Sequence, residues 1–236
     1  ISARGSGAVE EARDRALVYL FAYSGARSAE LLRDPNDSRR IGVTWADVDP
    51  EAGVIRVLGK SQTAGEEVQL PSQARPAVER YRRILDPPTE EWPVFPTRHV
   101  PSLYECARSE LSERVDGLES ELEANGPEAV LRRYEIPPPS ITTETVRNIF
   151  RRLCKEGEIP VEDEHEYLKP HGARRGAGEA LYRAEGASAA QRALRHEDPS
   201  TTSKMYSHIE ASEQADVASD AFEKIDEQTT TEDDAS

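Results

Sequence analysis

Residues 168–208 read LKPHGARRGAGEALYRAEGASAAQRALRHEDPSTTSKMYSH. His171 and Arg174 stand three residues apart, so a helix would place both on one face. His196 and Tyr206 follow. The planar fork of arginine fits phosphate oxygens in pairs, histidine carries a proton near neutral pH, and tyrosine can act as a covalent nucleophile. The stretch therefore predicts a site that binds a phosphate and attacks it.

These residues belong to a larger ordered set of motifs. His171-Gly172-Ala173-Arg174 resembles the His-x-x-Arg box of the tyrosine recombinases, the phage integrase family. Leu194-Arg195-His196 and Tyr206-Ser207-His208 resemble that family's Leu-Gly-His and Tyr-x-His ending. Upstream, SGARSAEL at residues 24–31 resembles its first arginine box, Thr-Gly-x-Arg-x-x-Glu-Leu, and Gly59-Lys60 falls where the family places its hairpin lysine. Each box alone is weakly specific, but the ordered set is specific.

Three departures from the family pattern stand out. Arg195 replaces the usual glycine before the second histidine, and Arg175 stands where many members have histidine. The run from His196 to Tyr206 is one residue longer than usual, which affects the register of the tyrosine.

The resemblance implies DNA cleavage and rejoining with no metal ion and no nucleotide cofactor. Tyr206 would form a 3′-phosphotyrosyl link and release a 5′-hydroxyl. The resemblance also implies roles for six other residues. Arg27, Arg174 and His196 would bind the nonbridging phosphoryl oxygens, and Glu30 would orient the Arg27 guanidinium. Lys60 would be the general acid for the leaving 5′-oxygen, and His171 would take or position the tyrosine proton.

Other interpretations remain open. Arg27 could be a surface arginine paired with Glu30, and Lys60 an ordinary loop lysine. The whole chain could be a non-catalytic DNA-binding regulator derived from an integrase, or could relax DNA as the related type IB topoisomerases do. A metal site at His165, His171 and His196 is the remotest alternative, because their spacing matches no common zinc motif.

The periodicity predicts an α+β fold that is mostly α. Apolar residues recur at helical spacing, alternating residues mark a small three-stranded antiparallel sheet, and a helical insertion interrupts the chain. We expect helices over about residues 8–24, from 28, and over 72–85, 142–156, 172–185, 188–195 and 209–225, with another carrying Tyr206. Strands are expected at 43–48, 54–58 and 66–70. The insertion at 97–139 is expected to be one long amphipathic helix, broken at 125–127 before a short helix at 128–134.

The domain organisation follows from these elements. We expect a catalytic domain over residues 1–225 and a disordered acidic tail over 226–236. The family's N-terminal DNA-clamping domain is expected to be missing from this chain. Similar proteins dock their last helix on a neighbouring subunit, which builds rings. Double-stranded DNA and a tetramer in the synaptic complex are therefore the expected partners, with a monomer off DNA left open.

Charge argues against DNA binding at first sight. The 236 residues carry 30 Lys and Arg against 45 Asp and Glu, a net charge of −15, whereas phosphate affinity comes from basic side chains. An acidic, lysine-poor chain is typical of proteins adapted to concentrated salt, and we expect a halophile's cytoplasm. Residues 168–208 are more basic than the rest, so a basic cleft inside an acidic surface is consistent with the composition. Cys106 and Cys154 are expected to be free thiols, and no apolar run is long enough to cross a bilayer.

Overall fold

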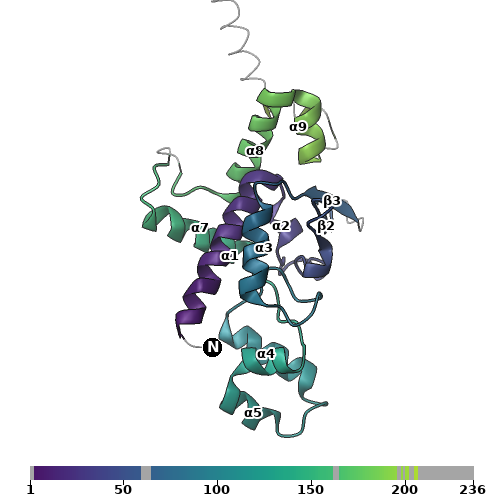
Figure 1. Cartoon of the computed structure of the whole chain (residues 1–236), viewed down its shortest axis with the longest axis vertical. Helices are drawn as coiled ribbons and strands as arrows, with labels where there is room; N and C mark the ends of the chain where they lie inside the picture. Colours follow the sequence, from purple (N-terminus) through teal and green to yellow (C-terminus); the bar gives the residue numbers. More distant parts are fainter. Residues whose placement is uncertain are drawn as a thin grey trace, which may run out of the picture. The chain divides into compact units, whose positions relative to one another are not determined.

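The computed structural model describes residues 3–59, 65–161, 165–195, 198, 200–201 and 205–206. Helices dominate, with one small sheet, in agreement with the predicted α+β class (Figure 1). The chain divides into two compact units, which meet in sequence between Ala177 and Gly178. Within the described residues, no helix is long and apolar enough to span a membrane.

Helix α1 (Ala3–Ser24) forms one wall of the core. Its buried stripe includes Ala16, Leu17, Leu20 and Phe21, spaced as one helical face requires. The helix begins at Ala3, earlier than the predicted residue 8. It ends as predicted, because Gly25 adopts a left-handed φ of 62° that breaks the helix before α2 (Ser28–Leu31) begins.

The sheet contains β1 (Val48–Asp49), β2 (Val54–Val57) and β3 (Glu66–Gln69), paired antiparallel in the order β1-β2-β3. Ile55 lies opposite Val68 and both are buried. The predicted strand at 43–48 is wrong except at its end. The carboxylate of Asp47 accepts hydrogen bonds from Thr44 N–H (2.8 Å) and Thr44 Oγ1 (2.9 Å), which closes a 3₁₀ turn, η1 (Trp45–Asp47), in place of the extended backbone.

Helix α3 (Arg75–Leu85) packs against α1 (Figure 1). It begins at residue 75 and not at the predicted residue 72. The backbone first forms a turn in which Ala74 N–H donates to Pro71 O (2.9 Å), and Pro76 then occupies the first turn of the helix.

The insertion is helical, as predicted, but its first helix is not continuous. The chain forms α4 (Val100–Leu111), α5 (Leu118–Asn125) and α6 (Pro127–Arg133). Gly117 has φ 75°, a left-handed value that an uninterrupted helix excludes, so α4 and α5 are separate. Arg132 donates to the carbonyls of Leu85 (2.7 Å) and Asp86 (2.8 Å), which joins α6 to the end of α3.

Three further helices follow in the chain: α7 (Thr143–Glu156), α8 (Pro170–Glu185) and α9 (Ala187–Leu194). Thr142 caps α7, because its Oγ1 accepts the N–H of Thr145 (3.2 Å). Ser200, Thr201, Met205 and Tyr206 are also helical, and the carboxylate of Asp198 accepts Ser200 N–H (2.8 Å) at the start of that segment. The predicted helix over 209–225 and the acidic tail lie outside the described residues.

Candidate active site

The junction between α1 and α2 is held rigidly. The hydroxyl of Ser24 donates to the carbonyl of Leu20 (2.6 Å) and accepts the backbone N–H of Ala26 (3.1 Å). Ser24, Gly25 and Ala26 are all buried. A buried hydroxyl that both donates and accepts fixes the backbone on each side of it. The sharp turn at Gly25 then brings Arg27 to the start of α2 in a defined position.

Arg27 is paired with Glu30, as predicted. Its NH1 lies 2.6 Å from Glu30 Oε1, and its backbone N–H donates to Glu30 Oε2 (2.7 Å). The Glu30 side chain is buried, whereas that of Arg27 remains 29% exposed. The buried carboxylate thus orients a guanidinium that still reaches the surface. The ion pair of Arg27 with Glu30 is therefore confirmed, and phosphate binding by Arg27 stays a prediction.

Arg174 approaches the same junction from α8. Its NH1 donates to the carbonyl of Gly25, two residues before Arg27, and Arg174 is only 5% exposed. His171 lies one turn earlier on α8 and is exposed. The structure therefore brings the two predicted phosphate-binding arginines to one short stretch of backbone. Two guanidinium groups against one buried carboxylate, that of Glu30, leave a net positive charge at this turn.

Tyr206 belongs to the second unit, where it is 1% exposed. Its ring packs against Tyr182, with ring centroids 5.2 Å apart, in a cluster with Ala190 and Leu194. Gly178 makes room for this ring. A Cβ at that position would lie well inside van der Waals distance of Tyr206 Oη and Leu194 Cδ1. The ring of the predicted nucleophile is therefore enclosed by Gly178, Tyr182, Ala190 and Leu194, which form its seat.

Lys60 and His196, the other two predicted catalytic residues, lie outside the described residues. Their chain neighbours are described. Leu58 and Gly59 follow the end of β2, and Arg195 has a left-handed φ of 51° at the end of α9. That conformation explains why glycine is usual at position 195 in the pattern that the chain resembles, since glycine adopts it without steric cost.

Sequence reasoning missed two residues that organise this site. Ser24 stands where the first arginine box usually has threonine, and the hydroxyl that both residues carry is the signal that could have identified it. Arg40, which binds backbone near Arg27 and near the end of β2, gave no signal, because it sits in a loop rich in charged residues.

The basic residues of α7 are mostly paired with acids. Arg147 lies 3.1 Å from Glu144, and Arg152 contacts both Glu156 (2.9 Å) and the buried Asp14 of α1. This pairing favours a structural role for these residues over contact with a DNA backbone. In the described part of the chain, no three His, Cys, Asp or Glu side chains gather as a metal site would require.

The chain is similar in sequence to a known family and in fold to solved structures. The model of the phage integrase family matches residues 5–213. Among solved structures, XerA recombinase aligns with a TM-score of 0.53 and 19% identity over 87% of this chain and 59% of its own. XerH recombinase bound to palindromic difH substrate, after cleavage, aligns with a TM-score of 0.55 and 16% identity over 93% of this chain and 47% of its own. A pre-cleavage XerH complex with difH substrate gives a TM-score of 0.54 at 16% identity, over 91% and 47%.

These structures share the fold, and the chain spans about half of their length. No curated protein sequence matches it. The family model, by contrast, covers most of the chain, including Arg27, His171, Arg174 and Tyr206. The chain belongs to the phage integrase family.

Proposed function

We propose that this protein carries out site-specific DNA recombination by metal-independent strand cleavage and rejoining through a 3′-phosphotyrosine intermediate. Family membership supports this proposal, as do the two XerH structures, which are complexes with a difH substrate before and after cleavage. The observation that carries it is the convergence of Arg27 and Arg174 on the buried α1–α2 junction.

The chemistry assigned to each side chain balances. The Tyr206 oxygen forms a bond to phosphorus as the bond from phosphorus to the 5′-oxygen breaks. His171 accepts or positions the tyrosine proton, and Lys60 supplies a proton to the leaving 5′-oxygen. Arg27, Arg174 and His196 stabilise the charge that develops on the nonbridging oxygens, at about 3 kcal/mol for each preorganised donor. Attack on phosphorus by a 5′-hydroxyl from another strand reverses these bond changes and exchanges the strands.

The enclosure of Tyr206 gives one alternative a specific basis. A phenol that is 1% exposed is not poised to attack a phosphodiester in the described state. If Tyr206 serves only packing, the protein is a DNA-binding regulator that has kept the family fold. If Tyr206 is the nucleophile, it must leave its seat when DNA binds.

Formation of an SDS-resistant protein–DNA adduct separates the two functions. The protein is incubated with supercoiled DNA of its own replicon in high KCl and EDTA, beside Tyr206→Phe. We expect an adduct from the parent alone, with DNA binding retained by the variant. DNA binding with no adduct from either protein would favour the regulator. Relaxation of plasmids that lack any specific site would point instead to topoisomerase-like activity.

We also propose that the protein acts in concentrated salt, in the cytoplasm, and assembles as a tetramer when two DNA sites pair. The net charge of −15 supports the first point, since high charge maintains solubility in such media. Unfolding measured across a KCl series tests it. Full stability in the absence of salt would contradict salt adaptation, and chemical crosslinking with and without DNA would test the tetramer.

A further inference from the structure

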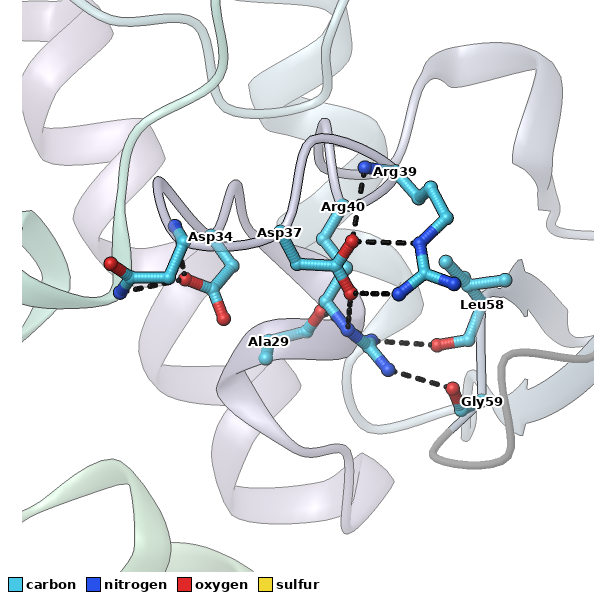
Figure 2. A network of polar contacts seen from close by, with 8 residues as sticks. Ala29, Asp34, Asp37, Arg39, Arg40, Leu58 and Gly59 are labelled. Carbon is cyan, nitrogen blue, oxygen red and sulfur yellow. Dashed lines mark hydrogen bonds and ion pairs between the residues drawn. The ribbon is translucent and has the colours of Figure 1, made fainter.

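The loop of residues 33–41, between α2 and η1, is folded back on itself. The backbone N–H of Asp34 donates to the carbonyl of Arg40 (2.9 Å), and the N–H of Arg40 donates to the carbonyl of Asp37 (2.9 Å). Asp37 also accepts two hydrogen bonds from the Arg39 side chain, to Oδ1 at 2.8 Å and to Oδ2 at 3.0 Å. The two backbone bonds close the loop from which the side chain of Arg40 extends. The Arg39 side chain binds Asp37 at the exposed side of that loop (Figure 2).

The guanidinium of Arg40 binds three backbone carbonyls. NH1 donates to Ala29 O (2.9 Å) and Leu58 O (2.8 Å), and NH2 donates to Gly59 O (2.7 Å) (Figure 2). Asp37 Oδ2 lies 3.6 Å from Nε, and the side chain is only 11% exposed. These donors are turned toward protein carbonyls, so Arg40 acts on the backbone and is not presented to a ligand as Arg27 is.

The three carbonyls belong to two parts of the proposed site. Ala29 lies in α2 between Arg27 and its partner Glu30. Leu58 and Gly59 lie just beyond the β2–β3 ladder, whose last pair is Val57 with Glu66. The carbonyls of Leu58 and Gly59 have no partner strand to donate to them in the ladder that the structure describes, and Arg40 supplies the donors.

The end of β2 is also packed closely. Gly59 is buried, and a Cβ there would collide with the carboxylate of Glu66. Residue 59 is the last before Lys60 in the chain. The hydrogen bonds from Arg40 to the carbonyls of Ala29, Leu58 and Gly59 form a carbonyl clamp. This clamp fixes the backbone that precedes the lysine against α2, the helix that begins directly after Arg27.

We infer that Arg40 is a positioning residue for DNA cleavage, which sets the segment leading to Lys60 against the phosphate-binding helix α2. The inference rests on the proposed function, because it assigns proton delivery to Lys60. Charge-assisted bonds from one rigid fork to carbonyls of two elements hold their spacing better than a flexible ammonium would. A displacement of about 1 Å at a catalytic group can slow a reaction by about 100-fold.

The test compares oxygen and sulfur leaving groups. The cleavage point is mapped from the adduct of the parent protein and built into two duplex oligonucleotides. One has the natural 5′-oxygen at the scissile bond and the other a bridging 5′-sulfur. A thiol has a pKa of about 8.5, so the sulfur can leave as the thiolate without a proton from a general acid. A defect confined to proton delivery therefore disappears on the sulfur substrate.

The variants are Arg40→Gln, Arg40→Lys, Lys60→Ala and, as a matched control, Arg39→Gln. Arg39 lies in the same loop and contacts the same Asp37, but its side chain is 54% exposed and is not part of the carbonyl clamp. We expect cleavage of the oxygen substrate to slow by about 10- to 100-fold in both Arg40 variants. Cleavage of the sulfur substrate should stay near the parent rate, as for Lys60→Ala, and Arg39→Gln should match the parent on both.

Hydrogen exchange in the intact protein provides a readout that needs no catalysis. Without the clamp, amides of residues 58–59 and 65–69 should exchange faster in Arg40→Gln than in the parent, and those of α3 should not change. Unchanged exchange, or parental cleavage of the oxygen substrate by Arg40→Gln, would overturn the inference.

Equal slowing of Arg40→Gln on both substrates would also overturn the inference, because the loss would then lie outside proton delivery. Failure of the proposed function looks different. In that case the parent itself forms no adduct, or Lys60→Ala shows no rescue by sulfur.

Discussion

Gly178 in α8 controls how tightly Tyr206 is enclosed, and Gly178→Ala tests this directly. An added methyl group would overlap the phenol oxygen of Tyr206 and Cδ1 of Leu194. Gly176, in the same helix, has open space around it and is the matched control. Gly176→Ala should raise the free energy of unfolding by about 1 kcal/mol, the ordinary gain of alanine over glycine within a helix.

Gly178→Ala receives the same helical gain but also overpacks the seat, at a cost of about 1–3 kcal/mol. We therefore expect it to be less stable than Gly176→Ala by about that amount. Since 1.4 kcal/mol is a factor of ten in an equilibrium constant, release of Tyr206 should become about 5- to 150-fold more favourable. If Tyr206 is the nucleophile and its release limits the reaction, adduct formation should rise as well.

The assay is nitration of Tyr206, read by peptide mass spectrometry, beside thermal unfolding of both variants. Faster nitration of Tyr206 in Gly178→Ala, with the other tyrosines unchanged, is the expected result. Equal melting temperatures and equal nitration in the two glycine variants would refute the description of the seat. A loss of stability without faster nitration would mean that Leu194 moves instead, and Leu194→Ala in the Gly178→Ala background should then restore stability.

Three further changes test the surroundings of the site. Ser24→Ala should lower the free energy of unfolding by about 1–3 kcal/mol, because it leaves the buried N–H of Ala26 without its acceptor, whereas Ser24→Thr keeps the hydroxyl and should stay near the parent. Arg195→Gly should raise the melting temperature, since a left-handed backbone costs a non-glycine residue about 1–2 kcal/mol, and a fall would show that the side chain of Arg195 contributes more than this strain. The hydrogen bond from the Arg39 side chain holds the pKa of Asp37 below its ordinary value. The ionised Asp37 therefore stabilises the folded protein above the ordinary aspartate pKa, and this stabilisation should be lost as the pH falls through the lowered pKa. The pH–stability curve of Asp37→Asn should lack this loss.

Local chemistry made part of the fold predictable. Gly25 ends α1 and Thr142 begins α7 because each residue has a strong positional preference that the sequence displays. The wrong prediction of a strand at residues 43–48 has a local cause too. At residues 43–48 the apolar alternation indicated a strand, but the Thr44–Asp47 hydrogen bonds close a turn. A side chain that competes for its own backbone overrides a weak β preference.

The site was predictable to the extent that its residues lie in short motifs. Arg27 and Glu30 are three residues apart, so their ion pair could be inferred from one helical turn. The contact of Arg174 with Gly25 joins residues far apart in sequence, as does that of Arg40 with Gly59, and no local pattern encodes either contact. The enclosure of Tyr206 depends on Gly178 in another helix, and no local sequence pattern marks that contact.

The same contacts bear on how so acidic a chain could work in concentrated salt. At about 1 M salt the Debye length is about 3 Å, so surface ion pairs such as Arg108 with Glu119 lose much of their attraction. Bonds from a guanidinium to a neutral carbonyl act at contact distance and do not depend on a second charge. Arg40, Arg132 and Arg174 all bind backbone carbonyls in this way, and each joins segments distant in sequence. If the protein is salt-adapted, the stability lost on removing Arg132, which binds two carbonyls and lies 3.7 Å from Glu128, should depend less on KCl than the stability lost on removing Arg108.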